Sequence, residues 1–475
     1  MAGCEYTTMD GDQPQQSLAS RAGRRTDRPR IVRLSLAVAV LVGLAAAGGN
    51  VAGRPSSPSP SLGLSLLQDR IPSTRPSAPP VPTGSAPNPG ARSQAEIGRL
   101  LVALKATPDS GDVYRDLGFA YLQRARDTGD PSSYPSAEEA FDQALIRLPD
   151  DALVLVGRGG LELARHEFAK ALDTGLAALR LAPGLPSAQS VVVDALIERG
   201  RYEEAQVVAG ALLLDDTLPA WNRTSYLREL NGDLPGALAA MEEAAVRGGA
   251  APENQAFTFT LVGTLNAYLG RSDRALIMYD KALNIFPEYG PALAGKARRA
   301  IAQGDLAEGV RLFERAVAIL PLSEYVIGLG EAQEVSGDMD AARRSYELAA
   351  FQIELFQANG VLVDVESALF AADHGEAAKA LEYAEASYAD RQNVKTADTL
   401  AWALYRNGRL DEAARYSGEA LRLGSRDPLF LYHAGAIAAE RGDAGAARTL
   451  LTDALDIDAG FSATGARDAR AILDR

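Results

Sequence analysis

The residue types that most often bind metals or move protons are scarce in this chain. Its 475 residues include three histidines, His166, His374 and His433, and one cysteine, Cys4. A zinc site needs His, Cys or carboxylate ligands at short spacings, and none of the histidines has such a partner nearby in the sequence. A histidine beside a turn often serves as a cation near a helix C-terminus. We therefore predict a structural role for all three, with no metal and no catalytic residue.

Motifs of catalytic domains are also missing from the sequence. No nucleophile elbow, phosphate-binding loop or dinucleotide fingerprint occurs together with the strand that each requires. We therefore expect no cofactor. The single cysteine excludes a disulfide framework and a thiolate metal site. These observations direct the search away from catalysis and toward binding surfaces.

Charge divides the chain into a basic N-terminal part and an acidic remainder. The formal net charge is -14. Residues 1–92 carry 10 arginines and 5 acidic residues, which leaves residues 93–475 with 38 basic and 57 acidic residues. Because an acidic surface repels polyphosphate, we expect no nucleic acid partner.

A glycine followed five residues later by a small residue recurs through the C-terminal three quarters of the chain. Successive glycines are 32 to 38 residues apart. Repeats of this period indicate a solenoid, in which each unit contacts its neighbours. The glycines are Gly200, Gly232, Gly270, Gly304, Gly337, Gly375, Gly408 and Gly442, and the small residues are Ala205, Ala237, Ala275, Gly309, Ala342, Ala380, Ala413 and Ala447.

Each period predicts two amphipathic helices joined by the glycine turn. A glycine accepts the left-handed conformation past a helix end, and an aspartate directly after it can cap the next helix. A proline after the second helix would end it. The aspartates are Asp233, Asp305, Asp338 and Asp443, the prolines are Pro149, Pro183, Pro287 and Pro321, and the bulky residues expected between helices are Phe141, Met241, Tyr279, Phe313, Tyr346 and Leu451.

The residue types and their spacing together resemble the tetratricopeptide repeat family over roughly residues 112–461. In the unit 254–287, Gly263, Gly270, Ala275, Tyr279, Ala282 and Pro287 fall at the places of that repeat. The resemblance implies an all-α, right-handed superhelical solenoid of about ten helix pairs. We expect 94–107 and 466–475 to be single helices that cap its ends.

The resemblance also implies that protein segments bind along a concave face lined by the first helix of each unit. The residues placed there are Phe257, Thr260, Thr264, Tyr268, Asp398, Trp402, Tyr405, Arg406 and Tyr432. Aromatic residues and arginine dominate interface energies, so Trp402, Tyr405 and Tyr432 are candidate anchors. Packing between helices would explain each of these residues equally well. The paired Lys and Asn positions with which some relatives hold a terminal carboxylate are absent, so that specificity is not expected here.

Four segments depart from the period. Residues 127–136 lengthen the turn of the first unit, the unit around Trp221 lacks a central glycine, and 246–253 forms a loose connection. About four extra residues also stand near 351–361. These departures either bend the superhelix or divide it into two arrays.

The composition of the first 92 residues suggests a targeting segment and a linker rather than a folded domain. Residues 34–47 form an apolar run preceded by six arginines, and 54–92 contain 10 of the 25 prolines. We predict a basic cytoplasmic segment at 1–30, a signal peptide or membrane anchor at 31–53, and a disordered linker at 54–92 before the solenoid at 93–475. As a cleaved signal peptide or as a retained membrane anchor, residues 31–53 would place the repeats outside the cytoplasm. A buried helix of a soluble protein is the alternative for that segment.

Taken together, the sequence predicts a bacterial, non-catalytic scaffold that binds other proteins outside the cytoplasmic membrane. The abundance of Arg, Ala and Gly is the compositional hint of a bacterial source. A different class of function is binding of glycan or cell-wall polymer, which aromatic residues beside acids and amides would also permit.

Overall fold

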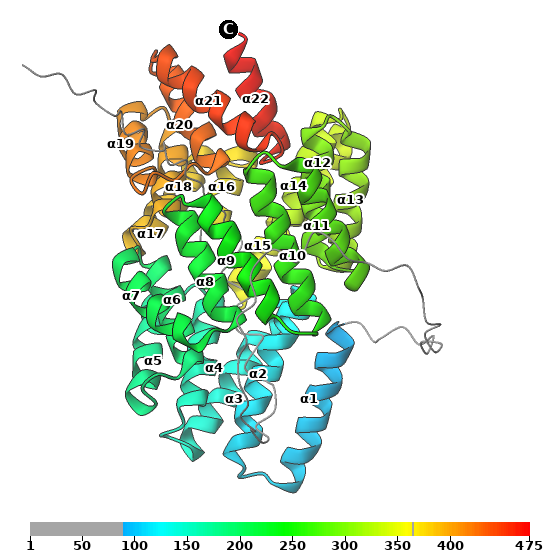
Figure 1. Cartoon of the computed structure of the whole chain (residues 1–475), viewed down its shortest axis with the longest axis vertical. Coiled ribbons are helices and arrows are strands. Elements are labelled where there is room, and N and C mark those ends of the chain that lie inside the picture. The colour runs from blue at the N-terminus through cyan, green and yellow to red at the C-terminus, as the bar shows by residue number, and fades with distance from the viewer. Residues whose placement is uncertain (1–88, 363–364) are drawn as a thin grey trace, which may run out of the picture. The chain divides into compact units, whose positions relative to one another are not determined.

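The chain folds as an α-solenoid over the residues that can be described. The computed structural model describes residues 89–362 and 365–475, all within one compact unit. Over these residues there are 22 α-helices and no strand (Figure 1). The all-α prediction is therefore confirmed. The expected segments at 1–30 and 31–53, and most of the linker, lie outside the described residues.

Ten helix hairpins follow one another between two single helices, as the period predicted. The single helices are α1 (Pro89–Ala106) and α22 (Ala463–Leu473). The hairpins are α2 (Gly111–Thr128) with α3 (Tyr134–Arg147), α4 (Ala152–Ala164) with α5 (Phe168–Leu181), α6 (Pro186–Glu198) with α7 (Tyr202–Leu212), α8 (Leu218–Leu230) with α9 (Leu234–Arg247), α10 (Pro252–Tyr268) with α11 (Ser272–Ile285), α12 (Gly290–Ala302) with α13 (Leu306–Ile319), α14 (Ser323–Val335) with α15 (Met339–Ala358), α16 (Val365–His374) with α17 (Ala377–Asp390), α18 (Val394–Arg406) with α19 (Leu410–Ala420), and α20 (Pro428–Glu440) with α21 (Ala444–Asp458).

The turns within the hairpins have the predicted chemistry. Gly200, Gly270 and Gly408 are among the turn glycines with a left-handed backbone, whereas Gly375 is not. Each of the four predicted aspartates accepts a hydrogen bond from the backbone N–H three residues later, as an N-cap does. Each of the four prolines stands two residues beyond the end of a helix, at α3, α5, α11 and α13. These local predictions are confirmed.

Small residues let the paired helices approach, and a bulky residue fills the space beside them. Phe141 is fully buried, and a Cβ atom added to Gly118 would lie 2.5 Å from its ring. Gly157 on the following hairpin faces the same ring. Tyr279 occupies the equivalent place between Gly263 and Gly295. The repeat therefore encodes a shared core between consecutive units.

The extra residues near 351–361 lengthen one helix and then contact earlier hairpins. Helix α15 has 20 residues, whereas α11 and α13 have 14 each. Beyond α15, Val361 is buried in the core that α2, α3 and α4 share. The backbone N–H of Leu362 donates to the carbonyl of Arg165, at 3.1 Å. The insertion thus ties the seventh hairpin to the second.

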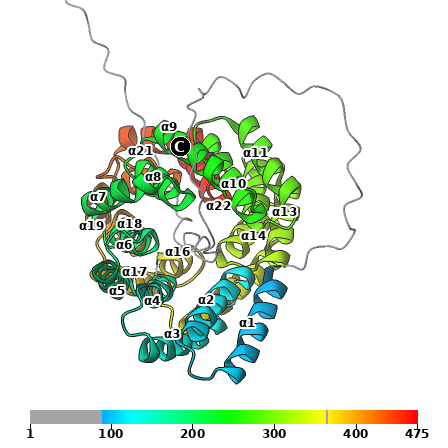
Figure 2. The same cartoon turned by 60° about the horizontal axis from the view of Figure 1, so that its bottom comes forward.

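Later hairpins pack directly against earlier ones. At the start of α18, Nδ2 of Asn393 donates to the carbonyl of Glu198 at the end of α6, at 2.7 Å. At the start of α22, the hydroxyl of Ser462 donates to Glu331 of α14, at 2.8 Å. A buried ion pair joins Arg299 of α12 to Asp458 of α21. The described hairpins therefore form one continuous, self-contacting coil (Figure 2).

The ends differ from the expectation in two details. Helix α1 begins at Pro89, so residues 89–92 belong to the solenoid and not to the linker. Helix α22 is more than a solvated cap, because Arg467 forms an ion pair with Glu334 of α14, at 2.9 Å. Among the described helices, none is both long and apolar enough to cross a membrane.

Candidate functional site

A cavity of about 670 Å³ lies where the ends of several hairpins converge. Its wall combines the end of α2 and the turn that follows it with the beginnings of α8, α10, α12, α14 and α16 and the end of α15. Figure 2 shows α4, α10 and α14 around α16, whose first turn contributes Glu366 and Ser367 to the wall. Helices distant in the sequence therefore build one concave space.

Two departures from the period, the long first turn and the insertion at 351–361, supply several residues of the wall, and the other two reach it only at their edges. The long first turn contributes Asp127, Thr128, Gly129 and Tyr134 to the wall, and Glu253, at the end of 246–253, contributes from the first turn of α10. The insertion at 351–361 contributes Ile353, Phe356 and Gln357 from the end of α15 and Val361 beyond it, and the fourth unit contributes Leu218 and Pro219 from the start of α8. Sequence reasoning noticed these irregularities but did not connect them, because their convergence depends on how the solenoid coils.

One part of the wall is aromatic. Phe257 from α10, Phe286 and Tyr289 from the connection between α11 and α12, and Phe356 from α15 all face the cavity. Phe286, Tyr289 and Phe356 keep part of their surface exposed, whereas Phe257 is 8% exposed. Such a surface can bury apolar side chains of a ligand without any rearrangement of the core.

Five acidic side chains and a single arginine supply the charges of the wall. The acids are Asp127, Glu253, Glu288, Glu324 and Glu366, and the arginine is Arg126. The pKa values of three of these acids are raised above their usual range, in each case mainly because burial disfavours the charged form: Glu253, Glu324 and Glu366. Glu366 has accessible surface, but that surface faces the crowded cavity.

Cations lie only at the outer limit of ion-pair distance from these acids. Glu324 is 3.9 Å from Arg298, and Glu253 is 3.9 Å from Arg92. Glu288 and Glu366 form no hydrogen bond or ion pair with another described residue. Burial lowers the pKa of Arg126, whose Nη2 donates to the amide oxygen of Gln123 at 2.5 Å. The wall is therefore acidic, and its acids are weakly compensated.

His166 stands at the edge of the cavity, in a turn where most other hairpins have glycine. Its φ is 61°, a left-handed value that few residues other than glycine adopt. Burial, with the charge of Arg391 acting in the same direction, lowers its pKa to about 4. His374 stacks on Tyr346 with ring centres 4.0 Å apart. No group of metal-ligating side chains occurs among the described residues.

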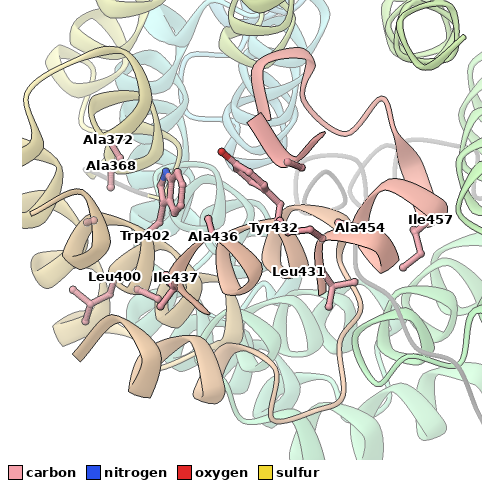
Figure 3. Packing of buried hydrophobic residues seen from close by; sticks show 14 of the residues in the cluster. Ala368, Ala372, Leu400, Trp402, Leu431, Tyr432, Ala436, Ile437, Ala454 and Ile457 are labelled. Atoms are coloured by element: carbon pink, nitrogen blue, oxygen red, sulfur yellow. The ribbon is translucent and has the colours of Figure 1, made fainter. Parts of the chain in front are cut away.

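The predicted groove residues do not form one open surface. Thr260, Asp398, Trp402 and Tyr432 are buried, Thr264, Tyr268 and Tyr405 are partly exposed, and Arg406 is exposed. Trp402 and Tyr432 lie within the hydrophobic cluster of α18, α20 and α21 (Figure 3). Only Phe257 of the nine lines the cavity. A role of these residues in binding a partner stays a prediction.

Polar contacts hold several of these residues inside the core. The indole N–H of Trp402 donates to Asp373 at 2.7 Å, and the ring of Trp402 stacks on His433 with centres 4.2 Å apart. His433 Nδ1 lies 2.8 Å from an oxygen of Asp398, and both side chains are 1% exposed. In α10, the hydroxyl of Thr260 donates to the carbonyl one turn earlier, at 2.7 Å. These contacts account for the burial of Trp402, Asp398 and Thr260 by packing within the solenoid.

Comparison with known proteins identifies the repeat. The family model described as tetratricopeptide repeat matches residues 122–186, 294–354 and 399–460. No curated protein matches the chain. Among solved structures, "Human IFIT1 dimer with PPP-AAAA" has 15% identity and a TM-score of 0.43, and covers 70% of this chain and 79% of that one.

The second structure, "Crystal structure of APC/C hetero-tetramer Cut9-Hcn1", also has 15% identity, with a TM-score of 0.36 and coverage of 81% of this chain and 93% of that one. Similarity at this level says nothing about what the present chain binds. The matches at 294–354 and 399–460 include the aspartate caps Asp305, Asp338 and Asp443, and the match at 122–186 includes the packing residue Phe141. The chain therefore contains tetratricopeptide repeats in these three regions.

Proposed function

We propose that this protein is a non-catalytic scaffold that binds a segment of another protein in the cavity bordered by Phe257, Phe286 and Phe356. Tetratricopeptide repeats suggest protein binding in general. The observation that carries the proposal for this chain is the convergence of two irregular segments, the long first turn and the insertion at 351–361, on one cavity. Departures from a repeat that serve only a turn or a bend have no reason to meet at one place.

The size and the lining of the cavity support a peptide-like occupant. A volume of about 670 Å³ falls in the range typical of ligand sites and would hold a few side chains of a bound segment. The aromatic residues offer apolar contact, and the exposed ends of helices offer polar contact. Recognition by side chains in a preformed space costs less ordering entropy than recognition by a mobile loop.

Photo-cross-linking in intact cells tests this proposal. A photoreactive phenylalanine analogue replaces Phe286 or Phe356, both in the cavity wall, or Val207, which is 75% exposed on α7 and does not line the cavity. We expect the two cavity positions to capture the same protein and Val207 not to capture it. Capture from Val207 alone, or no cavity-dependent capture, would contradict the proposal.

We further propose that the repeats act outside the cytoplasmic membrane. The arginines before the apolar run at 34–47 support this location, because positive segments tend to stay in the cytoplasm. A protease added to cells with a permeabilised outer layer and an intact cytoplasmic membrane should digest the solenoid. Protection equal to that of a cytoplasmic marker protein would refute this location.

A further inference from the structure

The charge of the cavity wall indicates which segments it can accept. We infer that the cavity recognises a basic side chain, Lys or Arg, that lies next to a bulky apolar residue in the bound segment. This inference rests on the proposed function, since it names the chemistry of the segment that the scaffold binds. It is carried by the position of the acids, their lack of close cations and their closeness to aromatic rings.

The acids outnumber the cations of the wall, and two of them lack a close cation. Five carboxyl groups face one guanidinium. Glu288 and Glu366 pair with no described residue, and the cations nearest to Glu253 and Glu324 lie at 3.9 Å. Glu288 and Glu366 are exposed, and Glu253 and Glu324 are partly exposed, so a ligand cation can reach these carboxylates and gain from the excess of negative charge.

Helix dipoles explain the positions of only some of these acidic residues. Glu253, Glu324 and Glu366 stand in the first turns of α10, α14 and α16, where a negative charge is favourable. Asp127, however, stands in the last turn of α2, where a negative charge is unfavourable. Asp127 and Glu253 also repel each other, which raises the pKa of Glu253 further. A ligand cation between them would relieve this repulsion.

Aromatic rings lie beside the acids. Phe257 follows Glu253 by four residues in α10, so both side chains lie on the same face of that helix. Both residues line the cavity, as does Phe286. A Lys or Arg side chain has an apolar stem that can lie against such rings while its charged end reaches a carboxylate. An apolar neighbour of that residue would occupy the remaining aromatic wall.

Peptide display on the full chain tests the inference. The probe is a random library of 12-residue peptides, selected on the wild-type chain and on a variant with Glu253→Gln and Glu366→Gln. Glu203→Gln is the matched control, because Glu203 is an exposed first-turn acid of α7 outside the cavity. We expect wild type and control to enrich Lys or Arg beside Phe, Leu or Ile, and the double variant to lose this preference.

A binding measurement with one selected peptide makes the test quantitative. Replacing its basic residue by citrulline should weaken binding to the wild-type chain about tenfold, the effect of one charge-assisted contact, and should change binding to the double variant little. Thermal unfolding of each variant separates loss of binding from loss of folding. An equal effect of citrulline on both chains would overturn the inference.

Other outcomes separate this inference from the proposed function. Selected peptides without a basic preference, or with an acidic one, would overturn the inference and leave the scaffold function in place if Phe356 still captures a protein. Arg70 and Arg75 are two of the arginines of the first 92 residues, and peptide binding that appears only after Arg70→Ala and Arg75→Ala would identify the chain's own N-terminal part as the occupant, which would refute another protein as the partner. A chain that retains no peptide and captures no protein would refute both proposals.

Discussion

Removal of the Asn393 side chain should loosen the contact between the third and the ninth hairpins. Asn393 is 2% exposed, and its side chain forms two important hydrogen bonds. Its Oδ1 accepts from the backbone N–H of Thr396, which caps α18, and its Nδ2 donates to the carbonyl of Glu198 in α6. Asn393→Ala therefore removes a cap and a buried hydrogen bond together.

The expected cost follows from these two contacts. Loss of an N-cap costs about 1 kcal/mol, and loss of a buried hydrogen bond that leaves its acceptor unsatisfied costs about 1–2 kcal/mol more. Asp305→Ala is the matched control, because Asp305 caps α13 through the N–H of Glu308 and its side chain forms no hydrogen bond to a distant hairpin among the described residues. We expect a cost of about 2–3 kcal/mol for Asn393→Ala and of about 1 kcal/mol for Asp305→Ala.

Urea denaturation and amide hydrogen exchange measure the two effects. Because repeat proteins open locally, exchange should rise at the end of α6 and the start of α18 in the Asn393 variant, and only near α13 in the control. Equal destabilisation by both substitutions, with no faster exchange in α6, would show that the bond to Glu198 does not hold the two hairpins together.

Three further predictions concern the packing and the pH dependence. Gly118→Ala should destabilise the chain by about 1–3 kcal/mol, because the added Cβ atom would lie 2.5 Å from the ring of Phe141. Gly98→Ala on α1, whose Cβ atom would lie in open space, should stabilise the chain by up to about 1 kcal/mol. Urea denaturation of the two variants measures both effects. Burial raises the pKa of Asp427 to about 7 from an ordinary 3.8. The folded state then binds more protons than the unfolded state between pH 4 and 7, so stability from this group is present at low pH and is lost as the pH rises through 7. Asp427→Asn should flatten this dependence in thermal unfolding at pH 5 and 8, and an unchanged slope would contradict the assignment. Trp402→Ala should cost about 3–5 kcal/mol in thermal unfolding, since the indole is 2% exposed; a stable variant with lost partner capture would instead support direct contact.

Features that depend on neighbouring residues were predictable from the sequence. The left-handed glycines, the aspartate caps and the proline stops follow from backbone geometry within a few residues. The buried alanines and Phe141 follow from the short distance between paired helices. These features are sufficient to predict ten hairpins and the type of repeat.

His166 marks the limit of such local prediction. It occupies a left-handed turn position that glycine fills in most other hairpins, and its spacing to Gly200 equals the repeat. Its burial and its lowered pKa, however, come from groups distant in the sequence, including Arg391. The period therefore places the residue in a turn but does not reveal its surroundings.

Sequence alone determined the repeat, its turns and its capping residues, because each results from interactions within one unit or between adjacent units. The tertiary structure decided which surfaces stay open. It buries Trp402 and Tyr432, joins the extension of α15 to Arg165, and brings the long first turn and the insertion at 351–361 to one cavity. These outcomes depend on the small rotation added by each hairpin, which accumulates over many units and is not encoded in any single repeat.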